Sequence, residues 1–257
     1  MNMPVPNRPD PVAAATDLVR ERFPAAQQAW LGGSVVLGGA TPMSDLDITV
    51  LDPTALVHRE SLRHLGWPVE LFVHTEASIR HFVTANQAER KPTMARLVAR
   101  GVPLLPGDGG AAVRRFCSEV LEAGPAPLPT ETLAAARYAL SDLVDDLLGA
   151  EPGPEGTAIA VETWRRTAEL LLDVNGRWRG GGKWLMREIV TLDSDTGTTW
   201  ASRLDAGLAA ALTGDTAVLR KTAEDCLALA GGRLWEGFHQ AAPVRPEPVN
   251  DPDQESR

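Results

Sequence analysis

The segment DLDITVL, residues 45–51, has the alternation of a half-buried β-strand. Apolar side chains at every second position share one face of such a strand, and the side chains between them share the other. Asp45 and Asp47 are two residues apart, so both carboxylates project from the same face. That arrangement places two oxygen donors within reach of one hard cation, and magnesium is commonly held by one or two carboxylates together with substrate phosphates.

A second strand is predicted for VELFVH, residues 69–74, by the same alternation. Glu70 lies on its polar face, and if the two strands pair, this carboxylate can join the site of Asp45 and Asp47. Three carboxylates raise one another's pKa when they lie close together, and a divalent cation relieves that repulsion. A third, weaker strand is predicted at residues 102–105.

The glycine-rich stretch GSVVLGGATPMS, residues 33–44, precedes the first strand. Gly33 allows the backbone to approach phosphate oxygens closely. The Ser34 hydroxyl and free backbone N–H groups at a helix start can then bind those oxygens. Ser34 and Ser44 are ten positions apart, which is enough for one short helix and a turn. A phosphate site beside a metal site indicates phosphoryl or nucleotidyl transfer.

The order Gly-Ser, a glycine four residues later, Ser-Asp-x-Asp on a strand and a carboxylate on a later strand resembles the nucleotidyltransferase superfamily of DNA polymerase β. With a helical region after it, the chain resembles the bacterial aminoglycoside nucleotidyltransferases. The specific match covers residues 31–74. The resemblance implies an α+β fold with a mixed β-sheet flanked by helices, followed by an α-helical bundle. It implies magnesium bound by Asp45, Asp47 and Glu70, with Glu70 as ligand or base, and nucleotide phosphates held by Gly33 and Ser34, helped by Ser44.

The sequence departs from that family at Val35 and Leu37, where many members carry a basic residue. We expect Lys183, in RWRGGGKW at residues 177–184, to supply the missing charge to the triphosphate, with Arg187 as a second choice. This stretch is not a P-loop, because Trp184 stands where a Ser or Thr binds magnesium. A surface loop between helices is an equally good interpretation of the lysine.

Composition changes near residue 124, where a proline-rich linker begins. We predict a tail at 1–10, a nucleotidyltransferase domain at 11–124, a helical domain at 125–241 and a second tail at 242–257. The predicted helices are 10–23, 110–123, 130–148, 155–178, 183–192, 200–212 and 216–238.

Bulk properties limit the partners. The 257 residues are 44% hydrophobic and 23% charged, with a net charge of −9, which disfavours nucleic acid and favours a cationic ligand. No stretch reads as a signal peptide or membrane span, and the two cysteines form no metal motif, so we expect a cytoplasmic protein.

The leading hypothesis is transfer of AMP from ATP to a hydroxyl of a small cationic acceptor such as an aminoglycoside, which would confer antibiotic resistance. Two alternatives stay open: adenylylation of a protein partner, as by an antitoxin, and a regulatory module that binds nucleotide without turnover. Further carboxylates that could bind such an acceptor, although a surface role is favoured for them, are Asp142, Asp145, Asp146, Glu162 and Glu169.

Overall fold

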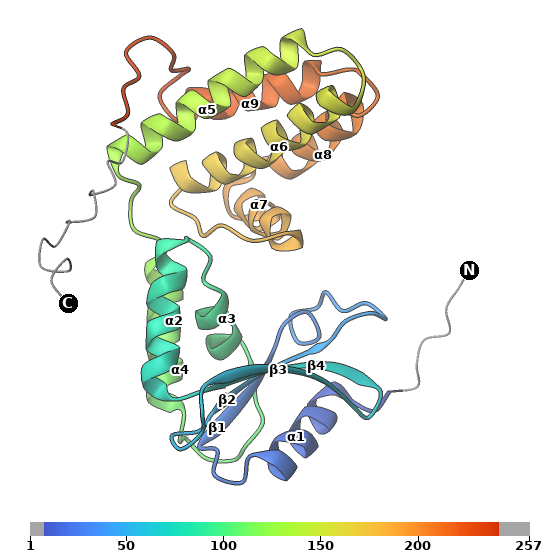
Figure 1. Cartoon of the computed structure of the whole chain (residues 1–257), viewed down its shortest axis with the longest axis vertical. Coiled ribbons are helices and arrows are strands. Elements are labelled where there is room, and N and C mark those ends of the chain that lie inside the picture. The colour runs from blue at the N-terminus through green and yellow to red at the C-terminus, as the bar shows by residue number, and fades with distance from the viewer. Residues whose placement is uncertain (1–7, 242–257) are drawn as a thin grey trace, which may run out of the picture. The chain divides into compact units, whose positions relative to one another are not determined.

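A computed structural model describes residues 8–241 and shows the expected α+β architecture (Figure 1). The predicted tail 242–257 and most of the tail 1–10 lie outside the described residues. Contacts divide the chain into two compact units. The first contains the described residues up to Pro127 together with Leu172–Ala201, and the second contains Leu128–Leu171 with the described residues from Ser202 onward.

The first unit is built on a five-stranded mixed sheet with the order β3-β4-β2-β1-β5. The central strands β2 and β4 are parallel, and the other neighbours are antiparallel. This confirms the mixed sheet and the strands predicted at 45–51 and 69–74. The sequence missed β1 and β3. The strands are β1 Gln28–Gly32, β2 Leu46–Leu51, β3 His58–His64, β4 Trp67–His74 and β5 Val102–Pro103.

Helix α1, Pro11–Arg22, covers one face of the sheet (Figure 1). Its N-cap residue Asp10 accepts a hydrogen bond from the backbone N–H of Ala13 at 2.9 Å, which stabilises the first turn. The core beneath it contains the predicted apolar faces of β2 and β4. Its fully buried members include Leu18, Val19, Leu46, Ile48, Val50, Val69, Leu71 and Val73.

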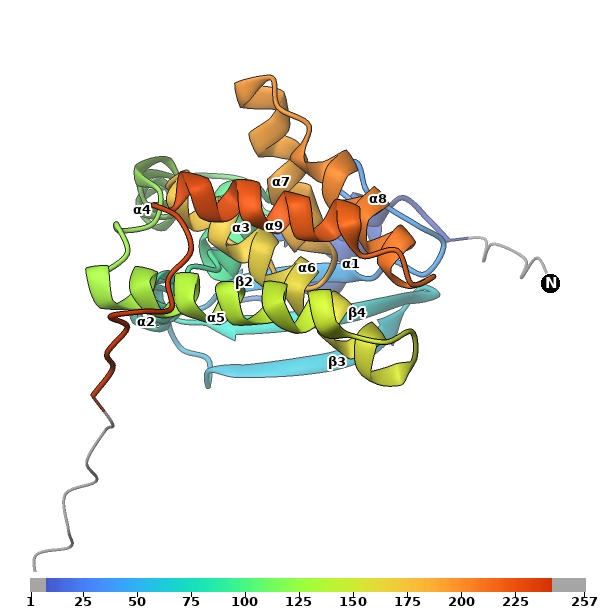
Figure 2. The ribbon, with the colours of Figure 1, turned by 90° about the horizontal axis from the view of Figure 1, so that it is seen from above.

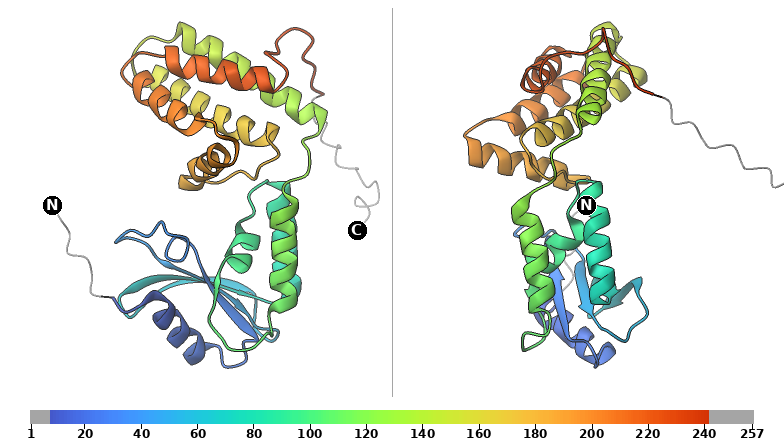
Figure 3. Two further views of the ribbon diagram at one scale, coloured as in Figure 1. Left: turned by 180° about the vertical axis from the view of Figure 1, so that it is seen from behind. Right: turned by 90° about the vertical axis from the view of Figure 1, so that its left-hand side faces the viewer.

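Three helices form a layer on the other face: α2 Glu76–Ala88, α3 Thr93–Ala99 and α4 Ala111–Ala123 (Figure 3). Helix α4 was predicted, whereas α2 and α3 were not. The second core includes Trp30 and Leu51 under these helices. Because Leu51 is at the end of β2 and Asp47 is near its start, the carboxylate end of this face lies outside the core.

Strands β3 and β4 form a hairpin whose two-residue turn is Leu65-Gly66. Both residues have positive φ, 47° and 82°, as a type I′ turn requires. Leucine is strained in this region, whereas asparagine tolerates it.

We expect Leu65→Asn to raise the free energy of unfolding by about 0.5–1 kcal/mol, measured by urea denaturation. Leu56→Asn is the matched control, because it also removes an exposed leucine but from ordinary backbone. If Leu65→Asn lowered the free energy of unfolding while Leu56→Asn did not, the claim that Leu65 is strained would be wrong.

The second unit is helical, as predicted for most of this region. Its helices are α5 Thr130–Gly149, α6 Pro154–Val174, α8 Trp200–Ala211 and α9 Ala217–Leu229. The end of α6 after Leu171 and the start of α8 before Ser202 are counted with the first unit. Helices α5 and α9 lie side by side (Figures 1 and 2). The predicted helix 216–238 is too long, because Gly231 and Gly232 adopt φ of 100° and 89° and end it. The helix predicted at 155–178 likewise ends at Val174.

Helix α7, Lys183–Thr196, belongs by its contacts to the first unit, although the sequence placed it in the helical region after residue 125. Ion pairs explain this membership. Glu188 of α7 accepts a hydrogen bond from Arg96 of α3, and Asp173 accepts hydrogen bonds from Arg90 and Arg179. The Asp173 side chain is fully buried, so the two arginines are needed to balance its charge. Lys183 is thereby brought to the unit that contains the sheet.

Among the described residues, no helix is both long enough and apolar enough to cross a membrane.

Candidate functional site

The predicted carboxylates meet at the start of the two parallel strands. Asp45 comes immediately before β2, Asp47 lies in β2, and Glu70 lies in β4. The register of the parallel pair places Asp47 directly beside Glu70. One oxygen from each of the three carboxylates lies within 4.8 Å of the others. The structure therefore brings together the three residues that the sequence selected for a divalent cation.

The electrostatics of this trio fit a hard divalent cation. The pKa of Asp47 is raised from its ordinary 3.8 to about 6, first by burial and then by the charges of Asp45 and Glu70. Lys183 and Arg59 act in the opposite direction. The donor set consists only of carboxylate oxygens, which magnesium prefers. A divalent ion there would neutralise the repulsion that raises the pKa of Asp47.

Gly33 is required at the turn after β1 for two reasons. Its φ is 73°, in the left-handed region that favours glycine. A Cβ atom at this position would also lie 1.9 Å from Oδ2 of Asp47, far inside van der Waals contact. The Gly33 backbone therefore lies against the carboxylate of Asp47, and its contact with phosphate stays a prediction.

The stretch between Gly33 and Ser44 differs from the short helix that the sequence predicted. Residues 34–38 form hydrogen-bonded turns, with Leu37 N–H donating to the Gly33 carbonyl at 3.3 Å and Gly39 N–H to the Ser34 carbonyl at 3.1 Å. Two consecutive glycines, Gly38 and Gly39, stand at the end of these turns, and glycine is among the weakest helix formers. The helix start that was expected to bind phosphate is therefore replaced by a single turn.

The two serine hydroxyls of this loop bond to each other. Ser34 Oγ and Ser44 Oγ are 3.0 Å apart, and Ser44 Oγ also accepts a hydrogen bond from Thr41 N–H at 2.9 Å. Both serines are buried, with 4% and 7% of their surface exposed. These bonds tie the two ends of the loop together. A role for either hydroxyl in binding phosphate stays a prediction.

Arg59 is a residue of this site that the sequence did not identify. It lies on β3, donates a hydrogen bond to Glu70 Oε1 at 2.6 Å, and places its guanidinium 5.3 Å from the centre of the Phe72 ring. Since β3 was not recognised as a strand, its alternation could not reveal that Arg59 and Glu70 share a face. The pairing holds the Glu70 carboxylate toward the site.

The predicted Lys183 lies at the first position of α7, where its charge lowers the pKa of Asp47. One turn later, Arg187 Nη2 lies 3.5 Å from the Gly39 carbonyl oxygen. The guanidinium groups of Arg96 and Arg187 lie 4.9 Å and 4.6 Å from the centre of the Trp184 indole ring. Both predicted cations of this helix are therefore placed near the carboxylates or the glycine-rich loop, within the first unit.

Asp47 and Glu70 line a cavity of about 300 Å³. One wall comes from the sheet and the Gly33 turn. The other comes from α3 and the two segments that precede α3 and α7. The charged and aromatic side chains that line it are Asp47, Glu70, Arg59, Phe72, Lys91, Arg96, Arg100, Arg179 and Trp184.

No protein-family model matches the chain, and no curated protein sequence matches it. Among solved structures, the chain is similar to the crystal structure of a nucleotidyltransferase-like protein from Exiguobacterium sibiricum 255-15, with 12% sequence identity and a TM-score of 0.37. The similarity covers 86% of this chain and 77% of that one. A likeness this weak carries no argument about activity.

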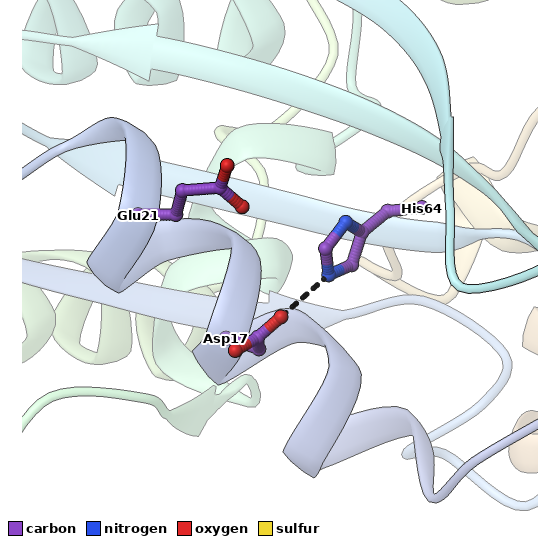
Figure 4. A group of neighbouring side chains, drawn as sticks. All are labelled: Asp17, Glu21 and His64. Atoms are coloured by element: carbon purple, nitrogen blue, oxygen red, sulfur yellow. Dashed lines mark hydrogen bonds and ion pairs between the residues drawn. The ribbon is translucent and has the colours of Figure 1, made fainter.

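A second group of possible metal ligands lies on the α1 side of the sheet. Asp17 and Glu21 of α1 and His64 of β3 bring their ligand atoms within 4.8 Å of one another (Figure 4). His64 Nε2 and Asp17 Oδ2 are 3.1 Å apart, and both acidic residues are exposed. A hydrogen bond between Asp17 and His64, which joins α1 to the sheet edge, accounts for the closeness of these two residues.

The other carboxylates considered from the sequence belong to the second unit. Glu162 accepts hydrogen bonds from Arg165 and Arg166, which lower its pKa, and Glu169 accepts one from Arg165 at 2.7 Å. Asp145 pairs with Arg233. These pairings fit the surface role that was favoured for them.

Proposed function

We propose that the protein is a magnesium-dependent nucleotidyltransferase that moves a nucleoside monophosphate, AMP from ATP, to a hydroxyl of a small acceptor. The observation that carries this proposal is the trio of Asp45, Asp47 and Glu70, whose oxygens lie within 4.8 Å of one another. Asp47 lies against the Gly33 backbone, and Asp47 and Glu70 line a cavity with cationic side chains on its other wall.

The residues have distinct parts in this reaction. Asp45, Asp47 and Glu70 would hold the magnesium ion, which when bound neutralises phosphate charge and orients the phosphates. The acceptor oxygen forms a bond to the α-phosphorus, the bond from that phosphorus to the oxygen bridging the β-phosphate breaks, and pyrophosphate leaves with that oxygen. A carboxylate of the trio takes the proton of the attacking hydroxyl. Arg59 positions Glu70, whether as a magnesium ligand or as the base, through its 2.6 Å hydrogen bond.

The charge of the protein bears on the chemical class of the acceptor. A cationic acceptor such as an aminoglycoside is favoured by the net charge of −9, and antibiotic resistance would follow from it. The direct test is to incubate the protein with Mg²⁺ and each α-³²P-labelled nucleoside triphosphate, with a panel of aminoglycosides, neutral sugars and sugar phosphates. With ATP, we expect the label on the acceptor as transferred AMP, together with release of unlabelled pyrophosphate.

The alternatives give different results in the same assay. Label found on a protein from a matched lysate, and on no small molecule, would support a protein acceptor. Nucleotide binding without pyrophosphate release would support a regulatory module. If neither nucleotide binding nor transfer occurs with Mg²⁺, the proposal is wrong.

Lys183→Ala is expected to weaken binding of Mg–ATP on the order of tenfold, because a charge-assisted contact to phosphate is lost. Calorimetric titration measures this, and Lys183→Arg, which keeps the charge, is the matched control. The same variant should raise the pKa of Asp47 further, since the Lys183 charge lowers it. NMR titration of the Asp47 carboxyl carbon provides that readout without turnover. Unchanged affinity and an unchanged pKa would remove Lys183 from the site.

A further inference from the structure

The glycine-rich loop supplies little charge to a bound triphosphate. The hydroxyls of Ser34 and Ser44 bond to each other, and the positions around them are apolar, with Val35 and Leu37 in the turn. A triphosphate that carries one divalent ion is still an anion, so cationic side chains must come from elsewhere. The wall of the cavity that faces the sheet is the part of the first unit where such side chains gather.

Five cations line the cavity against two carboxylates. Three of them have carboxylate partners: Arg59 pairs with Glu70, Arg96 with Glu188, and Arg179 with Asp173. The other two are Lys91, which is half-buried, and Arg100, which is exposed. Neither forms an ion pair within 4.0 Å of any acidic group in residues 8–241. Glu188, the partner of Arg96, also senses the Arg100 charge, which lowers its pKa, but no direct ion pair neutralises either Lys91 or Arg100 at the cavity.

Lys91 and Arg100 flank α3 at its two ends, and α3 packs on the strand that leads into the Gly33 turn. Thr93, Arg96, Leu97 and Arg100 recur at helical spacing and all line the cavity, so one face of α3 is directed into it. A Cβ atom on Gly32 would lie 2.6 Å from Leu97 Cδ2 and 3.3 Å from Leu97 Cα. The helix thus packs directly on the end of β1, next to Gly33.

The spacing of like charges on this face also favours an anion. Arg96 and Arg100 are four residues apart, where like charges repel on a helix. Burial lowers the pKa of Arg96, and the Arg100 charge lowers it further, while Glu188 opposes both effects. An anion at Lys91 and Arg100 would remove part of that repulsion. Arginine offers two parallel donors to phosphate oxygens, and lysine offers a compact charge.

We infer that Lys91 and Arg100 bind the β- and γ-phosphates of the nucleotide, and bind pyrophosphate after transfer. The inference rests on the proposed function and assigns the outer phosphates to α3 and the residue two positions before it. The α-phosphate stays beside Gly33 and the carboxylates. Lys183 and Arg187 come from a different segment, α7: Arg187 Nη2 lies 3.5 Å from the Gly39 carbonyl oxygen, and Lys183, whose charge lowers the pKa of Asp47, is left to the α-phosphate.

The test is calorimetric titration of the full chain with Mg²⁺ and three probes: ATP, inorganic pyrophosphate and AMP. Lys91→Ala and Arg100→Ala should each weaken ATP and pyrophosphate on the order of tenfold, as the loss of a charged contact predicts. AMP, which lacks the outer phosphates, should bind as in the wild-type protein. Arg100→Lys should recover part of the loss.

Arg115→Ala is the matched control, because this arginine on α4 is exposed and outside the cavity. It should leave all three affinities unchanged. Pyrophosphate affinity unchanged in both cavity variants would overturn the inference. A loss of AMP affinity equal to the loss of ATP affinity would overturn it too, because the two cations would then attract any anion and would not contact the outer phosphates. Variants that keep ATP affinity but lose transfer to sugar phosphates would instead place the two cations at the acceptor. A wild-type protein that binds neither ATP nor pyrophosphate would contradict the proposed function as well.

Discussion

Asp47→Asn is expected to stabilise the metal-free protein at pH 8 and to abolish Mg²⁺-dependent nucleotide binding. The native pKa of Asp47 is about 6, against 3.8 ordinarily, so between these values the folded state binds more protons than the unfolded state. Stability contributed by this group therefore falls as pH rises from about 4 to about 6. The cost at pH 8 is at most about 3 kcal/mol, and the neutral amide removes it.

Urea unfolding of both proteins at pH 8 and pH 4 measures this effect. The asparagine variant should be more stable at pH 8 and nearly equal to the wild-type protein at pH 4, where Asp47 is largely protonated. Addition of Mg²⁺ with a nonhydrolysable ATP analogue should stabilise only the wild-type protein. An asparagine variant that was less stable at pH 8, or that kept turnover, would remove Asp47 from the proposed centre.

Gly33→Ala is expected to destroy the site, whereas Gly38→Ala is expected to leave it nearly intact. Both glycines have positive φ, 73° and 79°, so alanine costs about 1–2 kcal/mol of backbone strain at either position. Only at Gly33 does the new methyl group collide, since it would lie 1.9 Å from Asp47 Oδ2, while no atom lies within 4 Å at Gly38. The difference between the variants isolates displacement of the carboxylate.

The measurement is the Kd of Mg–ATP, with unfolding followed in parallel. Gly33→Ala should weaken binding on the order of a hundredfold or more, as expected when a metal ligand is displaced. Gly38→Ala should change it by less than about threefold, well under 1 kcal/mol. Equal losses in the two variants would mean that backbone strain in the loop, rather than contact with Asp47, controls the site.

The predictable part of the fold is the part with clear periodicity. Apart from Leu51 and Phe72, strands β2 and β4 alternate because one face packs on α1, and this alternation placed Asp47 and Glu70 on one face once the two strands were taken to pair. Strand β1 shows no alternation because all five of its residues are buried. Strand β3 carries mostly polar residues, as edge strands often do, and its turn is Leu65-Gly66 rather than the common Asn-Gly.

The site residues that the sequence analysis did not identify lie on or beside strands and helices that it did not predict. Arg59 lies on the unrecognised β3, and Lys91, Arg96 and Arg100 lie on or beside the unrecognised α3. Each is a charged residue whose position depends on tertiary packing, such as the contact of Gly32 with Leu97. Lys183 could be proposed because a glycine-rich turn marked it locally. That α7 would join the first unit depended on the buried pairing of Asp173 with Arg90 and Arg179, which no local pattern reveals.

Asp45, Asp47 and Glu70 are proposed to bind one divalent ion together, beside a nucleotide. Crystals grown with Mn²⁺ and a nonhydrolysable ATP analogue can locate that ion through the anomalous scattering of manganese. We expect a peak about 2.1 Å from oxygens of these carboxylates, the distance of octahedral Mg²⁺ sites, with triphosphate density against the Gly33 backbone. Ordered nucleotide with no anomalous peak at the three carboxylates, or a peak only at Asp17, Glu21 and His64, would contradict the claim.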